Sequence, residues 1–333
     1  MIVDLMLLAA SFAVILIGAL VFTNAVEWLG QRLSIGEGAV GSLLAAVGTA
    51  MPESLIPLVA ILGGSAGAED VAIGAIVGAP FLLGTLAMAL VGIAAVAFVQ
   101  RRDQDRKLEI HGPTVRRDLV VFLAFFSGAL ALGLVGSDEI RIGAAILFVL
   151  GYGTYFVRTL KHGGEVQEED KLGPLFFDRR QGDDPRMVFI VIQFVLGLLA
   201  IGGGAHLFVE EATAVAEEIG IEVLILSLVL APLATELPEK LNSILWIRQG
   251  KDALALGNIT GAMVFQSTIP VAFGLAFTEW DLDKFAVLSM ALGLGGGVVA
   301  FITLAHRRRF GTVSIVIWLA LYLAFLAYVL VAA

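Results

Sequence analysis

The feature that most constrains this chain is a series of apolar stretches, each about 18 residues or longer, with short polar segments between them. A helix of roughly 20 apolar residues crosses the hydrocarbon layer of a bilayer, where it satisfies its own backbone polar groups. Apolar residues make up 59% of the chain, against about 45–50% in soluble domains, which excludes an ordinary soluble fold. We predict transmembrane helices near residues 4–26, 37–62, 70–98, 118–135, 140–157, 187–209, 221–246, 253–277, 284–304 and 311–331.

The distribution of basic residues predicts how these helices are oriented. Eighteen of the 21 Lys and Arg residues lie in one set of alternate loops, which includes 99–117, 158–186 and 305–310. Basic residues are enriched in cytoplasmic loops. We therefore expect an all-α, polytopic protein of the cell (inner) membrane, with about ten transmembrane helices and both termini outside.

The two halves of the chain carry the same motifs. Residues 49–53 (TAMPE) return as residues 235–239 (TELPE), and residues 74–79 (GAIVGA) return as residues 257–262 (GNITGA). Each half contains five predicted spans, and because five is odd the second half must be inverted relative to the first. Inverted repeats with broken helices at matching positions indicate the midplane site of a secondary transporter. We predict a first inverted repeat over 1–157, a cytoplasmic linker loop over 158–186 and a second inverted repeat over 187–333.

Each copy of the first motif places a glutamate directly after a proline in the middle of a predicted span. A carboxylate at that depth costs about 3 kcal/mol or more unless it is paired or hydrated. The proline lacks an N–H group, so the carbonyl four residues earlier loses its helical donor. Each half therefore predicts a helix break with a cluster of oxygen atoms, formed by Gly48, Thr49 and Glu53 in the first half and by Ala234, Thr235 and Glu239 in the second.

Oxygen ligands favour Ca²⁺, Na⁺ or Mg²⁺ over soft metals, and the absence of cysteine excludes thiolate sites. Glu236 and Gln266 add a carboxylate and an amide to the predicted site. Lys240 follows Glu236 by one helical turn, and it is either an internal counter-charge for Glu236 or a lysine that snorkels to the membrane surface. The alternative for the whole motif is structural, since proline kinks are common in membrane helices and a buried glutamate can be a pairing element. Its symmetric repetition favours a cation site.

The segment G-T-x-x-P-E followed by G-x-x-x-G, present once in each half, resembles the α-repeats of the sodium/calcium exchangers in the cation/Ca²⁺ antiporter superfamily. Residues 48–53 carry the first copy, and residues 234–239 carry the second with alanine in place of the glycine. The resemblance implies that both motif glutamates, Glu53 and Glu239, are ion ligands. It also implies that hydroxyls and carbonyls at the threonine positions bind ions.

The chain departs from the family pattern at several ligand positions. Serine usually follows the motif threonine, but Ala50 and Glu236 occupy those positions, and Leu83 and Gln266 replace an Asn or Asp of the partner helices. Several oxygen ligands are thus missing, while Glu236 adds a carboxylate beside the second motif glutamate. Two adjacent carboxylates raise the affinity of one for a proton, an effect that Lys240 opposes if it pairs with Glu236. We expect fewer coupled Na⁺ ions per cycle, with a proton able to replace at least one.

We predict a secondary active cation antiporter that exchanges Ca²⁺, or a similar divalent cation, for Na⁺ or H⁺ by alternating access. The alternatives are a proton-coupled divalent cation exchanger without sodium dependence, and a cation channel. An intramembrane metalloprotease is disfavoured because the four histidines form no H-E-x-x-H motif, and no enzyme activity is expected. We expect inorganic cations and the lipid bilayer as partners, no nucleic acid and no cofactor, and the oligomeric state is left open.

Overall fold

The structure, a computed structural model, describes residues 1–32, 51–64, 67–99, 108, 112–135, 138–162, 173–178, 184–307 and 310–332. All regular secondary structure in these ranges is helical, which confirms the all-α prediction. The first half contains α1 (Ile2–Arg32), α3 (Met51–Gly63), α4 (Ala68–Leu82), the π-helical segment η1 (Leu83–Ala87), α5 (Met88–Ala97), α6 (Gly112–Val135) and α7 (Asp138–His162). The second half contains α8 (Met187–Ile219), α9 (Val223–Arg248), α10 (Asp252–Gln266), α11 (Ile269–Phe277), α12 (Lys284–Ala300), the π-helical segment η4 (Phe301–Arg307) and α13 (Thr312–Ala332).

The part of the chain that the structure describes contains eight segments long and apolar enough to cross a membrane. Two shorter apolar stretches, Glu53–Gly63 in α3 and Val223–Leu233 in α9, fall within the two remaining predicted spans, 37–62 and 221–246. α9 has 26 residues and is long enough, but charged side chains interrupt its second half. The segment that precedes α3 lies outside the described residues. The total of ten spans and the inverted repeats therefore stay predictions.

One expected detail of the helices is wrong. α9 continues from Val223 to Arg248 through Pro238, where a break was predicted, because one proline removes a single hydrogen bond that neighbouring groups in a bundle can replace. The span expected over 253–277 is one of the eight, Asp252–Phe277, and it is interrupted between Gln266, where α10 ends, and Ile269, where α11 begins. Pro270 explains this interruption, because it offers no N–H group to the Gln266 carbonyl.

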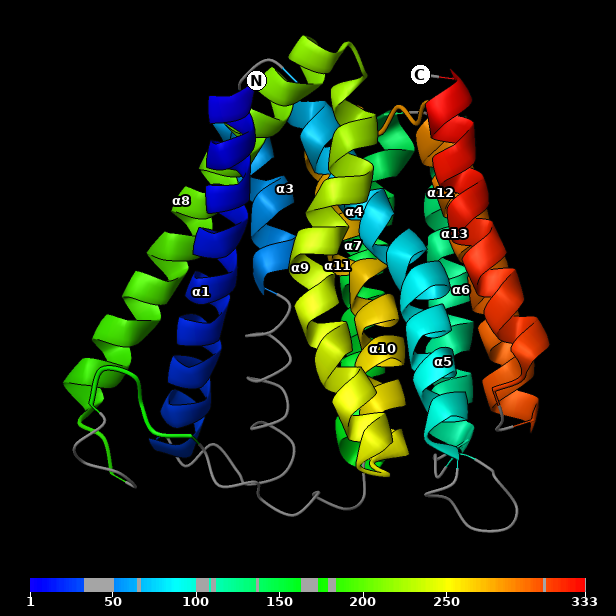
Figure 1. Cartoon of the computed structure of the whole chain (residues 1–333), viewed down its shortest axis with the longest axis horizontal. Helices are drawn as coiled ribbons and strands as arrows, with labels where there is room; N and C mark the ends of the chain where they lie inside the picture. The colour runs from blue at the N-terminus through cyan, green and yellow to red at the C-terminus, as the bar shows by residue number, and fades with distance from the viewer. Residues whose placement is uncertain are drawn as a thin grey trace.

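Both termini lie at the same end of the bundle (Figure 1). The connections from α8 to α9 and from α11 to α12 lie at that end, and the C-terminal ends of α1, α5 and α9 lie at the opposite end. Large apolar side chains are exposed on the outer helices, among them Leu20, Leu150, Leu199 and Leu323. Helices of this kind present their apolar surface to lipid, so the chain is a multi-pass membrane protein.

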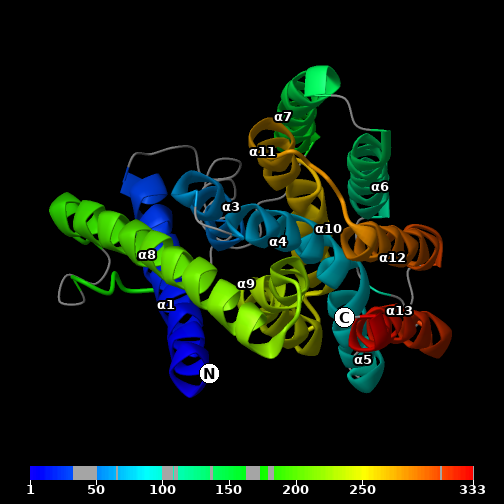
Figure 2. The same cartoon turned by 90° about the horizontal axis from the view of Figure 1, so that it is seen from above.

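α1 and α8 cross on one side of the bundle, away from α12 and α13 (Figure 2). α8 has 33 residues and is roughly 50 Å long, so it must tilt to fit a hydrocarbon layer of about 30 Å. The two backbones approach closely, because a methyl group built at Gly197 would lie 2.8 Å from the Phe22 nitrogen. Inside the contact, Gln193 Nε2 donates to Asn24 Oδ1 at 2.9 Å. The two helices form one tightly packed pair.

Part of the predicted linker packs against this pair. Trp28 Nε1 donates to the Gly173 carbonyl at 2.9 Å, and the Phe177 N–H donates to Gln193 Oε1 at 3.1 Å. Leu175 is fully buried. α7 continues to His162 and so includes the first residues assigned to the linker. The described segment 173–178 therefore joins the cytoplasmic ends predicted for α1 and α8.

α4 lies at the centre of the bundle and packs along α9. A methyl group built at Gly74 would lie 2.7 Å from the Leu224 carbonyl oxygen and 2.9 Å from the Leu228 nitrogen. The first glycine-rich stretch thus allows the close backbone approach that its spacing predicts. At Gly257 and Gly261, by contrast, an added Cβ would have no described atom within 4 Å. The second stretch does not repeat this contact among the residues described.

We expect Gly74→Ala to lower the free energy of unfolding by about 1–3 kcal/mol, because the added methyl group forces α4 away from α9. Gly143 is the matched control, since it is exposed on α7 and an added Cβ meets no atom within 4 Å. Alanine also favours the helical state at such a position. Thermal unfolding of both purified variants measures the difference, and equal melting temperatures would contradict this description of the α4–α9 contact.

Candidate functional site

Glu53 lies in the first turn of α3 as the structure describes it, and its side chain is 6% exposed. α3 packs against α4 and α8 and also contacts α9. Ile56, one turn after Glu53, shares an apolar cluster with Ala231 of α9. This cluster places the first motif glutamate on a helix that touches the helix carrying the second motif.

The second motif brings a buried ion pair to the middle of α9. Glu236 is 1% exposed and Lys240 is 0% exposed, and Lys240 Nζ lies 3.2 Å from Glu236 Oε2. Gln266, at the end of α10, donates from Nε2 to the other oxygen, Oε1, at 3.2 Å. Lys240 is therefore an internal counter-charge, and the alternative that it snorkels to the surface is wrong.

The depth of this pair follows from the helix itself. Glu236 is 13 residues from Val223 and 12 residues from Arg248, the two ends of α9. With a rise of about 1.5 Å per residue, the carboxylate lies roughly 20 Å from either end. Charges at such a depth are stable only when paired and hydrogen-bonded. Lys240 and Gln266 supply that partner and that hydrogen bond.

The pair also changes one expectation from the sequence. The proton affinity predicted for Glu236 rests on repulsion between two neighbouring carboxylates. The structure places Lys240 Nζ 3.2 Å from the Glu236 carboxylate, which is the pairing that the sequence argument named as opposing this repulsion. The like-charge argument for proton coupling through Glu236 is therefore weakened.

The other predicted oxygen ligands are described in part. Thr235 is 5% exposed, and its hydroxyl donates to the Ala231 carbonyl at 3.1 Å, so its oxygen lone pairs stay available to accept or to bind a cation. Ala234 and Glu239 lie in α9, but their side chains lie outside the described residues, as do Gly48 and Thr49 entirely. Among the residues described, no three His, Asp or Glu side chains could hold a metal ion together. The ligand set stays a prediction.

Two irregularities in the helices line up between the halves. In the first half, η1 begins at Leu83, and Thr85 Oγ1 donates to the Phe81 carbonyl at 2.6 Å. In the second half the break follows Gln266, and Thr268 Oγ1 donates to the Val264 carbonyl at 2.7 Å. These positions differ by the same offset, 183, as the glycine motifs. Irregular helical turns of this kind are frequent at functional sites.

The wall formed by α4 and η1 is apolar. Leu83, at a position where the resemblance predicts an Asn or Asp ligand, is fully buried, and Ala79 on the same wall is 2% exposed. The wall formed by α10 is only partly directed at the site. Gln266 reaches Glu236, whereas the Thr260 hydroxyl donates to Asp118 Oδ2 of α6 at 2.9 Å. The first half therefore contributes fewer polar groups than the second.

Asp118 is a buried polar residue that the sequence analysis did not single out. It is 2% exposed and also accepts a hydrogen bond from Tyr155 Oη at 2.9 Å. Arg117 Nη2 lies 3.0 Å from the same oxygen and neutralises it. The sequence feature that could have indicated Asp118 is an acidic residue at the start of the predicted span 118–135. Its partners lie on α7 and α10, far along the chain, so its role in joining α6, α7 and α10 depends on tertiary contacts.

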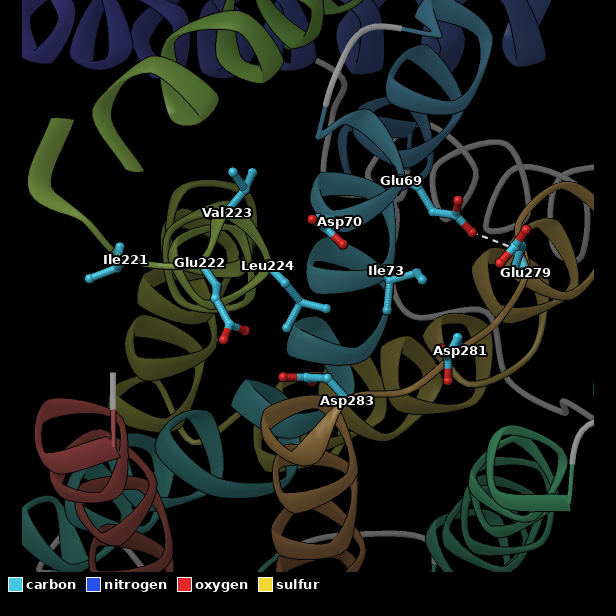
Figure 3. Close-up of a pocket in the computed structure, with 10 residues that line it drawn as sticks. All are labelled: Glu69, Asp70, Ile73, Ile221, Glu222, Val223, Leu224, Glu279, Asp281 and Asp283. Atoms are coloured by element: carbon cyan, nitrogen blue, oxygen red, sulfur yellow. Dashed lines mark hydrogen bonds between the residues drawn. The ribbon is translucent and has the colours of Figure 1, made fainter. Parts of the chain in front are cut away.

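A second missed feature is an acidic pocket at the end of the bundle that carries the termini. Its volume is about 560 Å³, and it is lined by the N-terminal ends of α4 and α9 and by the segment before α12. Figure 3 shows the Glu222 and Asp283 carboxylates directed toward each other across it. Six carboxylates line the pocket: Glu69, Asp70, Glu222, Glu279, Asp281 and Asp283. Such a concentration of one charge raises the local concentration of cations.

Comparison with known proteins agrees with this architecture. The family model described as sodium/calcium exchanger protein matches residues 3–161 and 189–331. The inner membrane protein YrbG of Escherichia coli is 26% identical over 251 residues, which cover 74% of this chain and 71% of that protein. Sodium/calcium exchanger MaX1 of Methanosarcina acetivorans is 23% identical over 288 residues, which cover 79% of each chain.

Solved structures share the fold. The crystal structure of the H⁺/Ca²⁺ exchanger CAX has a TM-score of 0.74 and 20% identity, and the match covers 98% of this chain and 82% of that one. The structure of the sodium-calcium exchanger NCX_Mj has a TM-score of 0.59 and 21% identity, and the match covers 98% of each chain. At these identities the likeness concerns the arrangement of the helices.

Proposed function

This chain belongs to the sodium/calcium exchanger protein family, and we propose that it is a secondary active antiporter that exchanges Ca²⁺, or a similar divalent cation, for Na⁺ or H⁺. Members of this family are exchangers and not enzymes, in agreement with the sequence prediction. The observation that carries the proposal is the meeting of two Pro-Glu helices, α3 and α9, with buried Glu53 on one and buried Glu236 on the other. Buried carboxylates at membrane depth indicate an ion pathway.

In the proposed mechanism, Glu53 and Glu239 hold either the divalent ion or its exchange partners, and never both. Thr49, Thr235 and the carbonyls of Gly48 and Ala234 supply further oxygen ligands, and Gln266 and Glu236 border the site. The acidic pocket would act as the approach from one side, because it lies where α4 and α9 begin. The offset shared by the two helix irregularities supports the proposed repeat, in which each half contributes one wall.

Alternating access is proposed to depend on the α1–α8 pair. These two helices pack tightly against each other and are joined by the 173–178 segment. Such a pair can slide as one unit over the bundle that holds the site. Its movement would expose the carboxylates first to one side of the membrane and then to the other.

The test of this function is uptake of ⁴⁵Ca²⁺ into proteoliposomes that contain the purified protein. We expect uptake when an outward gradient of Na⁺ or of H⁺ is imposed, and no uptake when both gradients are absent. The two gradients are imposed separately, so that the coupling ion is identified. Uptake that follows the Ca²⁺ gradient alone, without a counter-ion, would indicate a channel, and an absence of Ca²⁺ movement under either gradient would contradict the proposal.

The proposed orientation places both termini and the acidic pocket outside. Glu217, near the end of α8, and Gln249, just after α9, are both exposed and lie at opposite ends of the bundle. On this cysteine-free chain, we expect Glu217→Cys to react with an impermeant thiol reagent in intact cells, and Gln249→Cys to react only after the membrane is opened. The reverse labelling pattern would show that the orientation is inverted.

A further inference from the structure

The buried ion pair places a positive charge of the protein itself on α9, in the segment that carries the second Pro-Glu motif. Lys240 Nζ lies 3.2 Å from Glu236 Oε2, and both side chains are at most 1% exposed. Glu236 occupies the position after the motif threonine, and Lys240 directly follows the motif glutamate Glu239. An ammonium group carries one charge and binds carboxylate oxygens at short distance, as a bound monovalent cation does.

The remaining hydrogen bonds of Glu236 support a permanent arrangement. Gln266 donates to the carboxylate oxygen that does not face Lys240, so both oxygens of Glu236 are held. The Lys240 side chain is covalently attached and enclosed, so its ammonium group cannot be released to either side of the membrane as a bound ion is. Breaking such a buried pair is costly, because the charge left behind has no partner. The pair therefore persists through the cycle, while the transported ions exchange.

We propose that Lys240 acts as a built-in monovalent cation, which limits the exchange to one divalent ion for two monovalent ions. The inference rests on the proposed function and concerns its stoichiometry. Glu53, Glu236 and Glu239 carry three negative charges, and Lys240 cancels one. Two negative charges remain, which one Ca²⁺ or two monovalent cations neutralise. Transport is then electroneutral, because equal charge crosses the membrane in each direction.

The removal of Lys240 should change this balance in a measurable way. In Lys240→Gln the site carries three negative charges, and a third monovalent cation is needed when the divalent ion leaves. Each cycle then moves one net charge, which changes the equilibrium Ca²⁺ accumulation ratio about 50-fold per 100 mV of membrane potential. In Glu236→Gln/Lys240→Gln both charges are absent and two negative charges remain, so the exchange that this variant retains, whatever its rate, should again be electroneutral.

The experiment measures the equilibrium ⁴⁵Ca²⁺ accumulation ratio in proteoliposomes, with the potential clamped at 0 and at −100 mV by K⁺ and valinomycin. The counter-ion is the monovalent ion that drives wild-type uptake. We expect the wild type and the double variant to respond less than 2-fold to the potential, and Lys240→Gln to respond strongly. The accumulation ratio should rise with the square of the monovalent gradient in the wild type and with its cube in Lys240→Gln.

Several outcomes would overturn the inference. A wild-type protein whose Ca²⁺ accumulation follows the potential moves net charge, and the proposed stoichiometry is then wrong even though the proposed exchange is right. An electroneutral Lys240→Gln variant would show that the lysine charge does not set the balance. If Lys240→Gln does not fold, the potential dependence of the wild type and of the double variant decides, and a double variant that moves net charge also overturns the inference. Absence of Ca²⁺ transport in the wild type contradicts the proposed function instead.

Discussion

Glu53→Gln is expected to abolish Ca²⁺ exchange while the protein remains folded and inserted in the membrane. The side chain is 6% exposed, and it is the carboxylate of the first Pro-Glu motif. The amide keeps the shape of the side chain but removes its charge. Removal of one partner from a buried charge interaction costs about 3–5 kcal/mol, which corresponds to a loss of Ca²⁺ affinity of at least about 100-fold.

The matched control is Glu217→Gln, which neutralises an exposed glutamate on α8. We expect that variant to transport Ca²⁺ at the wild-type rate. Glu239→Gln should lose exchange as Glu53→Gln does, because the sequence gives it the equivalent place in the second motif. ⁴⁵Ca²⁺ uptake normalised to protein in the vesicles measures all three. Exchange by Glu53→Gln at a near wild-type rate would show that the site lies elsewhere.

The second large effect concerns the stability of the ion pair on α9. Lys240→Gln leaves the buried Glu236 carboxylate without its cation, which should lower the free energy of unfolding by about 3–5 kcal/mol. With a shift of about 2 °C for each kcal/mol, the melting temperature should fall by roughly 6–10 °C. In Glu236→Gln/Lys240→Gln both charges are gone, and the loss should be much smaller.

Thermal unfolding of the wild type, both single variants and the double variant completes a double-mutant cycle. We expect a coupling energy of at least about 2 kcal/mol between the two residues, because they lie in direct contact. Additive effects in the cycle would show that the 3.2 Å contact contributes little to stability. Recovery of the Lys240→Gln melting temperature by added monovalent salt would agree with a third cation occupying the vacated place.

The sequence was sufficient for the class of fold and for the family. The length of an apolar stretch decides whether a segment can span a bilayer, and this length is a local property of the sequence. The predicted ranges therefore match the described helices closely. α8 is the largest difference, since it extends ten residues beyond the predicted end at 209. The Pro-Glu motifs indicated a cation site because proline and glutamate in the middle of an apolar segment are costly unless they have a function.

The pairing of Lys240 with Glu236 could be suggested from their spacing but not decided. A lysine four residues after a glutamate either pairs with it or extends to the surface, and both conformations fit an isolated helix. Gln266 on α10 and the surrounding helices decide the outcome, because they enclose the pair and leave Lys240 fully buried. The four-residue spacing allows Lys240 to contact Glu236, and burial by the surrounding helices makes the paired conformation the favourable one.

Other features depended entirely on the tertiary structure. The acidic pocket gathers side chains from near residues 69, 222 and 281, which are far apart in the chain. Thr260, in the second glycine-rich stretch, donates its hydroxyl to Asp118, because α10 contacts both α6 and α9. The proline at position 238 leaves α9 continuous, whereas the one at position 270 separates α10 from α11.

The physical reason for this division is the range of the interactions. The sequence by itself determined which segments enter the membrane, where the carboxylates lie along them and which family the chain resembles, because hydrophobicity and motif spacing act along the chain. The tertiary structure decided which charge meets which partner, which glycines are in contact and where the acidic residues gather. These outcomes depend on the distances between helices, and only the packed bundle sets them.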